Sequence, residues 1–507
     1  MTKKTTKWPI GMASLLSCGT ALAQNASNPN IVFVFPDQFR NCSMEFWNDA
    51  AYADKVRWKA DPAVTPRLRE FAGQSVVLSN AVSNCPISSP YRGIFLTGMY
   101  PERSGIQSNC MSLRPTCSLA PDAECISDVL NANGYECAYI GKFHAQFPTP
   151  NNPQKAGTYV EERWPAWDAY TEPHQRHGFD WWYSYGTFDE HFNPHYWDND
   201  GRRTDPHEFS VKHEVDKAIE FLQGRNDKTR PFFLCLGMNP PHSPYSNEGD
   251  CNACDLDLYR NKSLKELYVR ENADTTMEKA PSMRYYLANV TAVDREFGRL
   301  MDYLREAALD ENTIVVFTSD HGETMCSHGV QDPKNSIWTE AFNVPFIIRY
   351  PRVLEHRTDD MLLSTIDIMP TLLSLAGLAD KVPATAEGRD LAPALRGEKP
   401  SGVDCALYIR NLNGEPDLDG MIRRYFPQAR GIKTARYTFE VSIKRDGSLA
   451  GMKLFDDWSD PYQLHSLKRS ANKALYRSML AKLQDKLRES NDVWYRESIL
   501  DKISTSL

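Results

Sequence analysis

The fold is decided by an apolar run that ends on polar residues, Ile31-Val32-Phe33-Val34-Phe35-Pro36-Asp37-Gln38. Three later runs have the same form: Tyr135–Ile140 leads into Gly141-Lys142-Phe143-His144, Phe232–Gly237 into Pro240-Pro241-His242, and Thr313–Thr318 into Asp320-His321. In an open parallel sheet, ligands bind beyond the carboxyl ends of the strands. The four polar clusters are therefore predicted to meet at one site, although nearly 300 residues separate the first from the last.

Helices are expected between these strands. The predicted helices are Cys125–Asn133, His213–Gln223, Met283–Ala308 and Asp367–Ala376, with a further strand at Val344–Arg349. Apolar strands that alternate with helices are typical of an α/β fold, in which helices cover both faces of a parallel sheet. The chain is long enough to bury a large core of this kind.

The pattern changes past about residue 400. Short strands are predicted at Ala406–Arg410, Thr438–Val441 and Lys453–Phe455, before an amphipathic helix at Lys473–Glu489. This order indicates a smaller antiparallel sheet with a helix. We therefore divide the chain into a signal peptide (1–23), a catalytic α/β domain (24–400) and a C-terminal α+β subdomain (401–507).

Between Asn151 and Arg203 the alternation stops, and the chain becomes rich in Trp, Tyr, His and Pro. A long irregular segment inside a compact domain is usually functional, and aromatic side chains beside polar groups suit sugar rings. The same aromatic residues could equally form a small core against the sheet. The candidate substrate contacts are His191, His195 and Trp197 from this region and His465 from the C-terminal part.

The composition excludes some classes of function. The 507 residues are 41% hydrophobic and 24% charged, as in an ordinary soluble globular protein. The net charge of −8 and the lack of a basic run give no reason to expect nucleic acid or an anionic membrane as a partner.

The N-terminus has the pattern of an export signal. Three lysines precede the short apolar stretch Ile10–Leu22, and cleavage is predicted after Ala23. Leu15-Leu16-Ser17-Cys18 could instead be a lipoprotein site, which would make Cys18 a lipidated first residue. A signal cleaved after Ala23 and a lipidated Cys18 both predict a periplasmic or extracellular location. No other segment approaches the ~20 apolar residues of a transmembrane span.

Twelve cysteines in an exported chain could include disulfides. Cys251 and Cys254 are the closest pair in sequence. A zinc site would need a second pair of ligands nearby, which the sequence does not offer. A local disulfide and two free thiols therefore both remain open.

The most specific stretch is Ser88-Ser89-Pro90-Tyr91-Arg92-Gly93-Ile94-Phe95-Leu96-Thr97-Gly98. It resembles the signature of type I sulfatases, in which Cys or Ser, any residue, Pro, any residue and Arg precede Leu-Thr-Gly. The resemblance implies that Ser88 is oxidised to formylglycine by a serine-type sulfatase-maturing enzyme. Cys85 lacks Pro and Arg at the required spacing. Tyr91 stands where Ser or Ala is common, at a position that tolerates change.

The resemblance covers essentially the whole chain after the signal, and it implies an alkaline-phosphatase-like fold with a large mixed, mostly parallel sheet. It also implies that Asp37, Gln38, Asp320, His321 and residue 88 bind one divalent cation. A site made mostly of oxygen ligands suits Ca²⁺, while His321 leaves a transition metal open.

The remaining motifs supply the implied catalytic groups. Lys142 and His144 match Gly-Lys-x-His, His242 matches Pro-His-x-Pro, and Lys334 matches a second active-site lysine. In the implied mechanism, Arg92 and the two lysines offset the negative charge of the sulfate. Hydrated formylglycine attacks sulfur, His242 protonates the departing alcohol with Lys334 beside it, and His144 then accepts a proton so that sulfate leaves.

These features favour an exported carbohydrate sulfatase. The resemblance points to the 6-O-sulfate of N-acetylglucosamine, from host glycosaminoglycan or mucin, with 6-sulfated galactose or N-acetylgalactosamine as the second candidate. The rival enzyme is a phosphonate monoester hydrolase or phosphodiesterase of the same superfamily. An inactive protein that binds sulfated glycans is a third class, but binding alone needs no second-step base such as His144.

Overall fold

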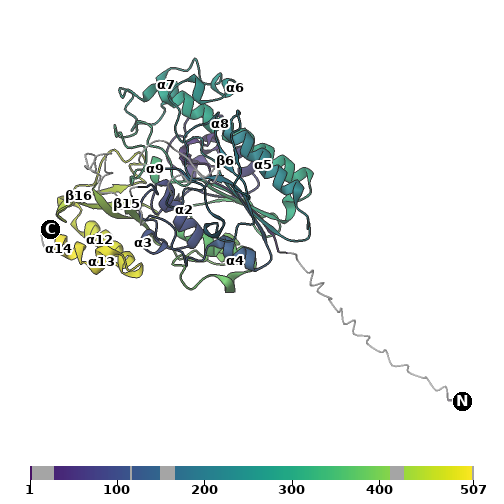
Figure 1. Ribbon diagram of the computed structural model, residues 1–507. Coiled ribbons are helices and arrows are strands. Elements are labelled where there is room, and N and C mark those ends of the chain that lie inside the picture. Colours follow the sequence, from purple (N-terminus) through teal and green to yellow (C-terminus); the bar gives the residue numbers. More distant parts are fainter. Residues whose placement is uncertain (3–27, 113, 115–116, 149–165, 412–426, 505–507) are drawn as a thin grey trace.

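The computed structural model describes residues 1–2, 28–112, 114, 117–148, 166–411 and 427–504 (Figure 1). The predicted signal peptide lies almost wholly outside these residues, as does Cys18, so export stays a prediction. Within the described residues, no helix has both the length and the apolar character needed to cross a membrane.

The molecule is built around a ten-stranded mixed sheet with the strand order β11-β2-β10-β9-β1-β8-β4-β5-β6-β7. Its strands are β1 (Asn30–Val34), β2 (Val76–Leu78), β4 (Glu136–Lys142), β5 (Trp181–Tyr185), β6 (Tyr196–Trp197), β7 (Arg203–Thr204), β8 (Phe232–Gly237), β9 (Thr313–Thr318), β10 (Phe346–Arg349) and β11 (Arg357–Asp359). The central strands β9, β1, β8, β4 and β5 run parallel to one another. Their carboxyl ends therefore lie at one edge of the sheet, as the sequence predicted.

Helices cover both faces of this sheet (Figure 1). Ile31 and Phe33 of β1 face a core shared with α2, α4 and α10, whereas Val32 and Val34 face a core shared with α1, α5 and α8. These helices are α1 (Pro66–Ala72), α2 (Ser88–Thr97), α4 (Ile126–Ala132), α5 (Ser210–Gly224), α8 (Met283–Glu306) and α10 (Ile368–Leu375). The burial of alternate β1 residues on two faces explains why the strand is apolar throughout.

The predicted smaller sheet is also present. It is a four-stranded antiparallel sheet in the order β13 (Ala406–Arg410), β14 (Gln428–Lys433), β15 (Tyr437–Ile443) and β16 (Leu449–Asp456). Helices α12 (Lys473–Glu489), α13 (Val493–Arg496) and α14 (Ile499–Ser504) pack on it through a shared apolar cluster. The predicted architecture, a large mixed sheet between helices with a smaller antiparallel sheet and helix, is therefore confirmed, while the domain limits 24–400 and 401–507 stay a prediction.

Two local predictions differ from the structure. β10 pairs antiparallel with β9, because the connection between them, which holds only the four-residue helix α9 (Thr339–Phe342), returns the chain in the opposite direction. β5 is a parallel strand inside the region that we expected to be irregular. Its sequence, Trp-Trp-Tyr-Ser-Tyr, lacks the aliphatic run used to find the other strands, yet aromatic residues also favour strands.

The shorter elements complete the described chain. They are β3 (Ala81–Val82), β12 (Leu363–Ser364), α3 (Pro101–Ser104), α6 (Ala253–Leu256), α7 (Leu264–Leu267), α9 (Thr339–Phe342) and α11 (Ala392–Leu395). β3 and β12 pair with each other in parallel as a separate two-stranded sheet.

We expect Gly322→Ala to destabilise the fold. Gly322 follows the Asp320-His321 pair, donates its N–H to the Ala341 carbonyl at 2.9 Å, and has no room for a Cβ, which would meet the Glu340 carbonyl oxygen. Because that neighbour is backbone, the loop itself must shift, at a cost of about 1–3 kcal/mol of the free energy of unfolding. Urea unfolding measures this loss.

Gly73→Ala is the matched control. Gly73 ends α1 with φ −64°, and its added Cβ would lie 3.5 Å from the nearest neighbour, the Glu70 carbonyl oxygen. We expect no loss of stability there, because Ala accepts this backbone conformation and reduces the entropy of the unfolded chain. Equal losses for the two variants would contradict the steric explanation.

Candidate active site

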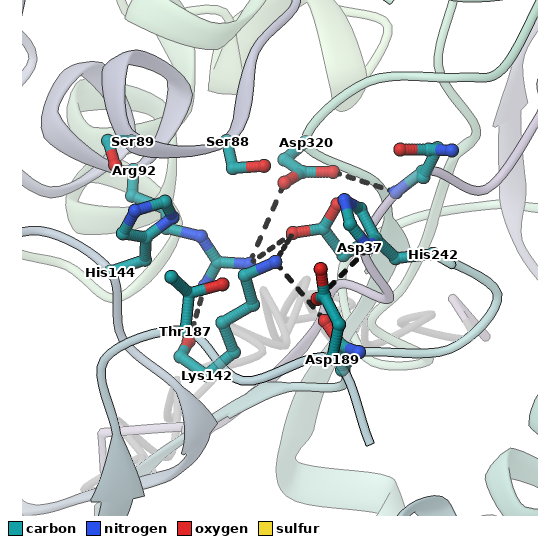
Figure 2. Close-up of polar contacts among 12 residues, drawn as sticks. Asp37, Ser88, Ser89, Arg92, Lys142, His144, Thr187, Asp189, His242 and Asp320 are labelled. Atoms are coloured by element: carbon teal, nitrogen blue, oxygen red, sulfur yellow. Dashed lines mark hydrogen bonds and ion pairs between the residues drawn. The ribbon is translucent and has the colours of Figure 1, made fainter. Parts of the chain in front are cut away.

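The predicted site residues meet at the carboxyl ends of the parallel strands. Asp37 follows β1, Lys142 ends β4, His242 follows β8 and Asp320 follows β9, while Ser88 is the first residue of α2. Figure 2 shows Lys142 and Arg92 extending toward the two aspartates, with Ser88 above and His242 on the opposite side from His144. Ser88, Arg92, Asp37 and Asp320 are all buried.

Helix α2 explains the spacing of the signature. Ser88 and Arg92 are four residues apart, so they share one face of the helix. Pro90 costs no hydrogen bond, because the first N–H groups of a helix have no partner within it. The same free N–H groups make the N-terminus of α2 favourable for an anion.

A cluster of unpaired ligand atoms lies beside Ser88. Ligand atoms of Asp37, Asp320 and His321 all lie within 4.8 Å of one another. Oδ1 of Asp37, Oδ2 of Asp320 and Oε1 of Gln38 are buried without a hydrogen-bond partner. Buried oxygens are expensive to leave unpaired. The residues therefore fit a divalent cation.

His321 offers the cluster a nitrogen lone pair. Its Nδ1 donates to the Gly322 carbonyl at 2.9 Å, so Nε2 is left facing Ser88 Oγ at 3.3 Å and Asp37 Oδ1 at 3.5 Å. Burial, with the nearby charge of Lys334, lowers the pKa of His321 well below its ordinary value. The ring is therefore neutral, as a metal ligand must be.

Gln38 is oriented by two residues that the sequence analysis missed. Its amide nitrogen donates to the Glu323 carboxylate and to the Tyr245 hydroxyl, which turns Oε1 toward the cluster. Its backbone lies in the left-handed region at φ 68°, held by a 3.0 Å bond from its N–H to Asp320. The only sequence signal for Glu323 was its place three residues after Asp320.

The two aspartates repel each other and are balanced by cationic side chains. Burial, and then the charge of Asp37, raises the pKa of Asp320 to about 7. Burial alone would raise the pKa of Asp37, but Lys142 and neighbouring cationic groups hold it well below its usual range. Lys142 Nζ lies 2.9 Å and Arg92 Nη2 lies 3.2 Å from Asp37 Oδ2. A bound cation would complete this balance.

His144 has the form of a neutral base. Its Nε2 donates to the Cys110 carbonyl at 3.1 Å, so the buried and unpartnered Nδ1 keeps its lone pair. Burial lowers the pKa of His144 well below its ordinary value, and the charges of Lys142 and Arg92 lower it further.

His242 and Lys334 form a pair at the opposite side of the cluster. Lys334 Nζ lies 2.9 Å from Nε2 of His242. The other ring nitrogen faces the Ser243 carbonyl at 3.1 Å and the Asp189 carboxylate at 3.3 Å. The sequence analysis missed Asp189, whose only signal is that it lies just after β5.

The four predicted substrate contacts each have protein partners in the structure. His191 is buried with Nδ1 against the Asp250 carbonyl at 3.0 Å, and His195 is buried 2.6 Å from Asp168. Trp197 belongs to a small aromatic core with Tyr170, Tyr183, Tyr185 and Tyr196, which was the alternative explanation of the aromatic region. His465 is exposed, and its backbone N–H binds the Asp460 carboxylate.

The cysteines take no part in the cluster. Within the described residues every cysteine is a free thiol, including Cys251 and Cys254. Cys85, which the sequence analysis excluded as the signature residue, is buried in the core beneath the smaller sheet.

Comparison with known proteins decides the family. A family model described as Sulfatase matches residues 29–378, and one described as N-sulphoglucosamine sulphohydrolase, C-terminal, matches residues 326–492. This chain belongs to the sulfatase family. The sulfatase is accordingly a sulfuric ester hydrolase, and the resemblance found in the sequence is confirmed at the level of the family.

Two curated relatives that match nearly the whole chain are sulfatases by name. An endo-4-O-sulfatase from Bacteroides thetaiotaomicron is 52% identical over 488 residues, which cover 94% of this chain and 96% of the relative. An ulvan-active sulfatase from Formosa agariphila is 30% identical and covers 94% of this chain and 86% of its own length.

Two solved structures resemble this chain over 94% of its length. One from work on the metabolism of multiple glycosaminoglycans by Bacteroides thetaiotaomicron has a TM-score of 0.90 at 52% identity, covering 94% of this chain and 99% of that chain. A putative sulfatase from Bacteroides fragilis has a TM-score of 0.82 at 30% identity, with the same coverage. A phosphonate monoester hydrolase of Agrobacterium radiobacter, at 18% identity and a TM-score of 0.61, shares the fold alone.

The expected substrate was wrong. A relative at 52% identity is an endo-4-O-sulfatase, whereas an N-acetylglucosamine-6-O-sulfatase of Bacteroides thetaiotaomicron is only 24% identical. The 6-O-sulfate of N-acetylglucosamine is therefore withdrawn, together with 6-sulfated galactose and N-acetylgalactosamine. The motifs that identify the family carry no information about the sugar.

A cluster that fits a divalent cation predicts a thermal shift on addition of Ca²⁺. Adding Ca²⁺ to chelator-treated protein should raise the melting temperature, because a cation that binds only the folded state stabilises it by about 2.7 kcal/mol at a hundredfold excess over Kd. Asp320→Asn should lose most of this shift, because it weakens one of the ligands.

Asp302→Asn is the control for this measurement. Asp302 is a partly exposed carboxylate of α8 that pairs with Arg67 and Arg305. It should keep the full shift in melting temperature. An equal calcium shift in wild type and in Asp320→Asn would show that the cation binds elsewhere.

Proposed function

We propose that this sulfatase hydrolyses 4-O-sulfate esters within glycosaminoglycan chains, and that it acts on the polymer instead of only on chain ends. The observation that carries the proposal is 52% identity, over nearly all of both chains, to an endo-4-O-sulfatase. The TM-score of 0.90 to a structure from work on glycosaminoglycan metabolism supports the same substrate class.

In this proposal Asp37, Gln38, Asp320 and His321 hold one calcium ion, and Ser88 becomes formylglycine through a serine-type sulfatase-maturing enzyme. The unpartnered buried oxygens and the neutral imidazole support the ligand set. The cation supplies positive charge for the sulfate oxygens, and formylglycine supplies a hydrated aldehyde as the nucleophile.

The chain's own cationic groups offset the remaining charge of the sulfate. Arg92 and Lys142 lie against Asp37, at 3.2 and 2.9 Å, and the N-terminus of α2 adds its free N–H groups. Groups placed in this way before the reaction need no rearrangement as charge builds on the transferring sulfuryl group. Loss of one such donor typically costs about 2.7–4 kcal/mol of activation free energy.

Two histidines divide the proton transfers between them. His144 is neutral and buried, and its Nδ1 lone pair accepts a proton from the second hydroxyl at residue 88 so that sulfate can leave. His242, beside Lys334 at 2.9 Å, serves the departing alcohol. The two rings are thus assigned to the two steps of one cycle.

Export is part of the proposal. The lysines and the apolar stretch before Ala23 support secretion to the periplasm or the cell exterior, with Cys18 as the alternative lipid attachment point. Such a location gives the enzyme access to polymers that do not enter the cell.

Ser88→Ala should abolish sulfate release while the protein stays folded. The lost contact is one hydrogen bond to His321, worth about 0.5–1.5 kcal/mol, whereas the nucleophile disappears entirely. Mass spectrometry of the active protein should find residue 88 lighter by two hydrogen atoms. Cys85→Ala should keep activity, and sulfate release by Ser88→Ala would disprove the assignment of residue 88.

Sulfate release should depend on the position of the ester. Ion chromatography should detect sulfate from chondroitin 4-sulfate and not from chondroitin 6-sulfate, with long oligosaccharides preferred over disaccharides. A phenyl phosphonate monoester serves as the control for the rival activity and should not be cleaved. Equal release from the 4- and 6-sulfated polymers, or activity on disaccharides alone, would contradict the proposal.

A further inference from the structure

Asp189 lies next to the ring that serves the departing alcohol. Its Oδ1 is 3.3 Å from Nδ1 of His242, and on the other side of that ring Nε2 is 2.9 Å from Lys334 Nζ. Figure 2 shows the Asp189 and His242 side chains side by side. The His242 ring thus contacts the Asp189 carboxylate through one nitrogen and the Lys334 ammonium group through the other.

The loop that carries Asp189 is held in place by the side chain of Asp168. Oδ1 of the buried Asp168 accepts the N–H groups of Gly186 at 2.6 Å and Thr187 at 3.1 Å, and its Oδ2 lies 2.6 Å from His195. A Cβ at Gly186 would come within 2.8 Å of the same carboxylate. The backbone two residues before Asp189 is therefore anchored, even though the Asp189 side chain is 49% exposed.

The surroundings of His242 make one tautomer dominant. A carbonyl can only accept, so the Ser243 carbonyl oxygen at 3.1 Å calls for a proton on Nδ1, which the Asp189 carboxylate also favours. The Ser243 hydroxyl, 3.2 Å from Nδ1, can accept from the same N–H. Burial would raise the pKa of Asp189, but His242, Lys142 and Lys334 hold it well below its usual range. Asp189 is therefore ionised at neutral pH.

Other charged groups also influence the ring. Those whose charges interact with His242 are Asp37, His191 and His321, in addition to Asp189. Asp189 is the carboxylate in contact with the ring, and a surface ion pair of this kind contributes little to stability. Its position against one specific nitrogen suggests another role.

We propose that Asp189 is a positioning residue for the protonation of the leaving alcohol: it holds His242 with Nδ1 protonated and stabilises the charged ring, so that the proton shared with Lys334 resides on Nε2. The inference rests on the proposed sulfatase function of this site. Asp189 keeps the Nδ1 proton at its side throughout and is not itself protonated.

A hydroxyl of residue 88 gives its proton to solvent as its oxygen forms a bond to sulfur, and the bond from sulfur to the carbohydrate oxygen breaks with its electron pair left on that oxygen. The oxygen takes the proton from Nε2, which leaves a neutral imidazole. Solvent returns one proton to the pair from His242 and Lys334 before the next turnover.

Kinetics test this role. Asp189→Asn should lower kcat for sulfate release from chondroitin 4-sulfate by about 10–100-fold, part of the 10²–10⁴-fold that general acid catalysis supplies, with KM almost unchanged. Asp189→Glu should restore part of kcat. In a His242→Ala background, Asp189→Asn should cause no further loss, because the two residues act as a unit. Asp200→Asn, a surface carboxylate paired with Arg202, is the control and should match wild type.

A rise in KM with kcat unchanged would overturn the proposal, because Asp189 would then be a substrate-binding group. Full additivity with His242→Ala would overturn it as well.

A measurement on the protein without substrate tests the role of Asp189 independently of the proposed sulfatase activity. The ¹⁵N chemical shifts of His242, assigned by comparison with His242→Gln, report its tautomer, and Asp189→Asn should increase the fraction of the ring that lacks a proton on Nδ1. An identical tautomer in both proteins would refute the role of Asp189 even if the natural substrate proved to be another ester.

Discussion

The repulsion between Asp37 and Asp320 is the constraint on which the site depends. Two carboxylates are buried in one cluster, where each would cost several kcal/mol if left unpaired. Lys142 and Arg92 approach from one side, and unpartnered oxygens define the place of a cation on the other. The charge balance that stabilises the folded protein is thus the same balance that suits a divalent anion such as sulfate. Stable folding and the proposed catalysis therefore both require cationic side chains beside Asp37 and Asp320.

The sheet supplies the rigidity that this balance requires. β1 is buried on both faces, so the loop that begins at Asp37 starts from a fixed point. Helix α8 supports the same loop from one face, where the Tyr286 hydroxyl donates to the Gln38 carbonyl at 2.8 Å. Helix α2 presents Ser88 and Arg92 from the opposite face. Groups carried on strand ends and helices can be held at a more constant geometry than groups carried on free loops.

Chemistry and substrate choice are encoded in different parts of the chain. Ser88, Lys142 and His242 belong to the motifs that resemble the sulfatase family, and the fold brings them together beyond the ends of the parallel strands. No motif in the sequence marks a surface for the sugar. This division explains why the family could be predicted while the position of the sulfate on the sugar was predicted wrongly. His195 was also predicted to contact the sugar. In the structure it is buried 2.6 Å from Asp168, the carboxylate that binds the backbone of Gly186 and Thr187.

The sequence by itself determined the apolar strands, the polar residues at their ends and the four-residue spacing of Ser88 and Arg92. Each of these is a local pattern, set by burial on a sheet or by the turn of a helix. Only the tertiary structure decided the aromatic strand β5, the antiparallel β10, the left-handed backbone of Gln38, and the contacts of Glu323 and Asp189. Those features depend on which strands become neighbours: Glu323 lies 285 residues from Gln38, and no local pattern specifies a contact over that separation.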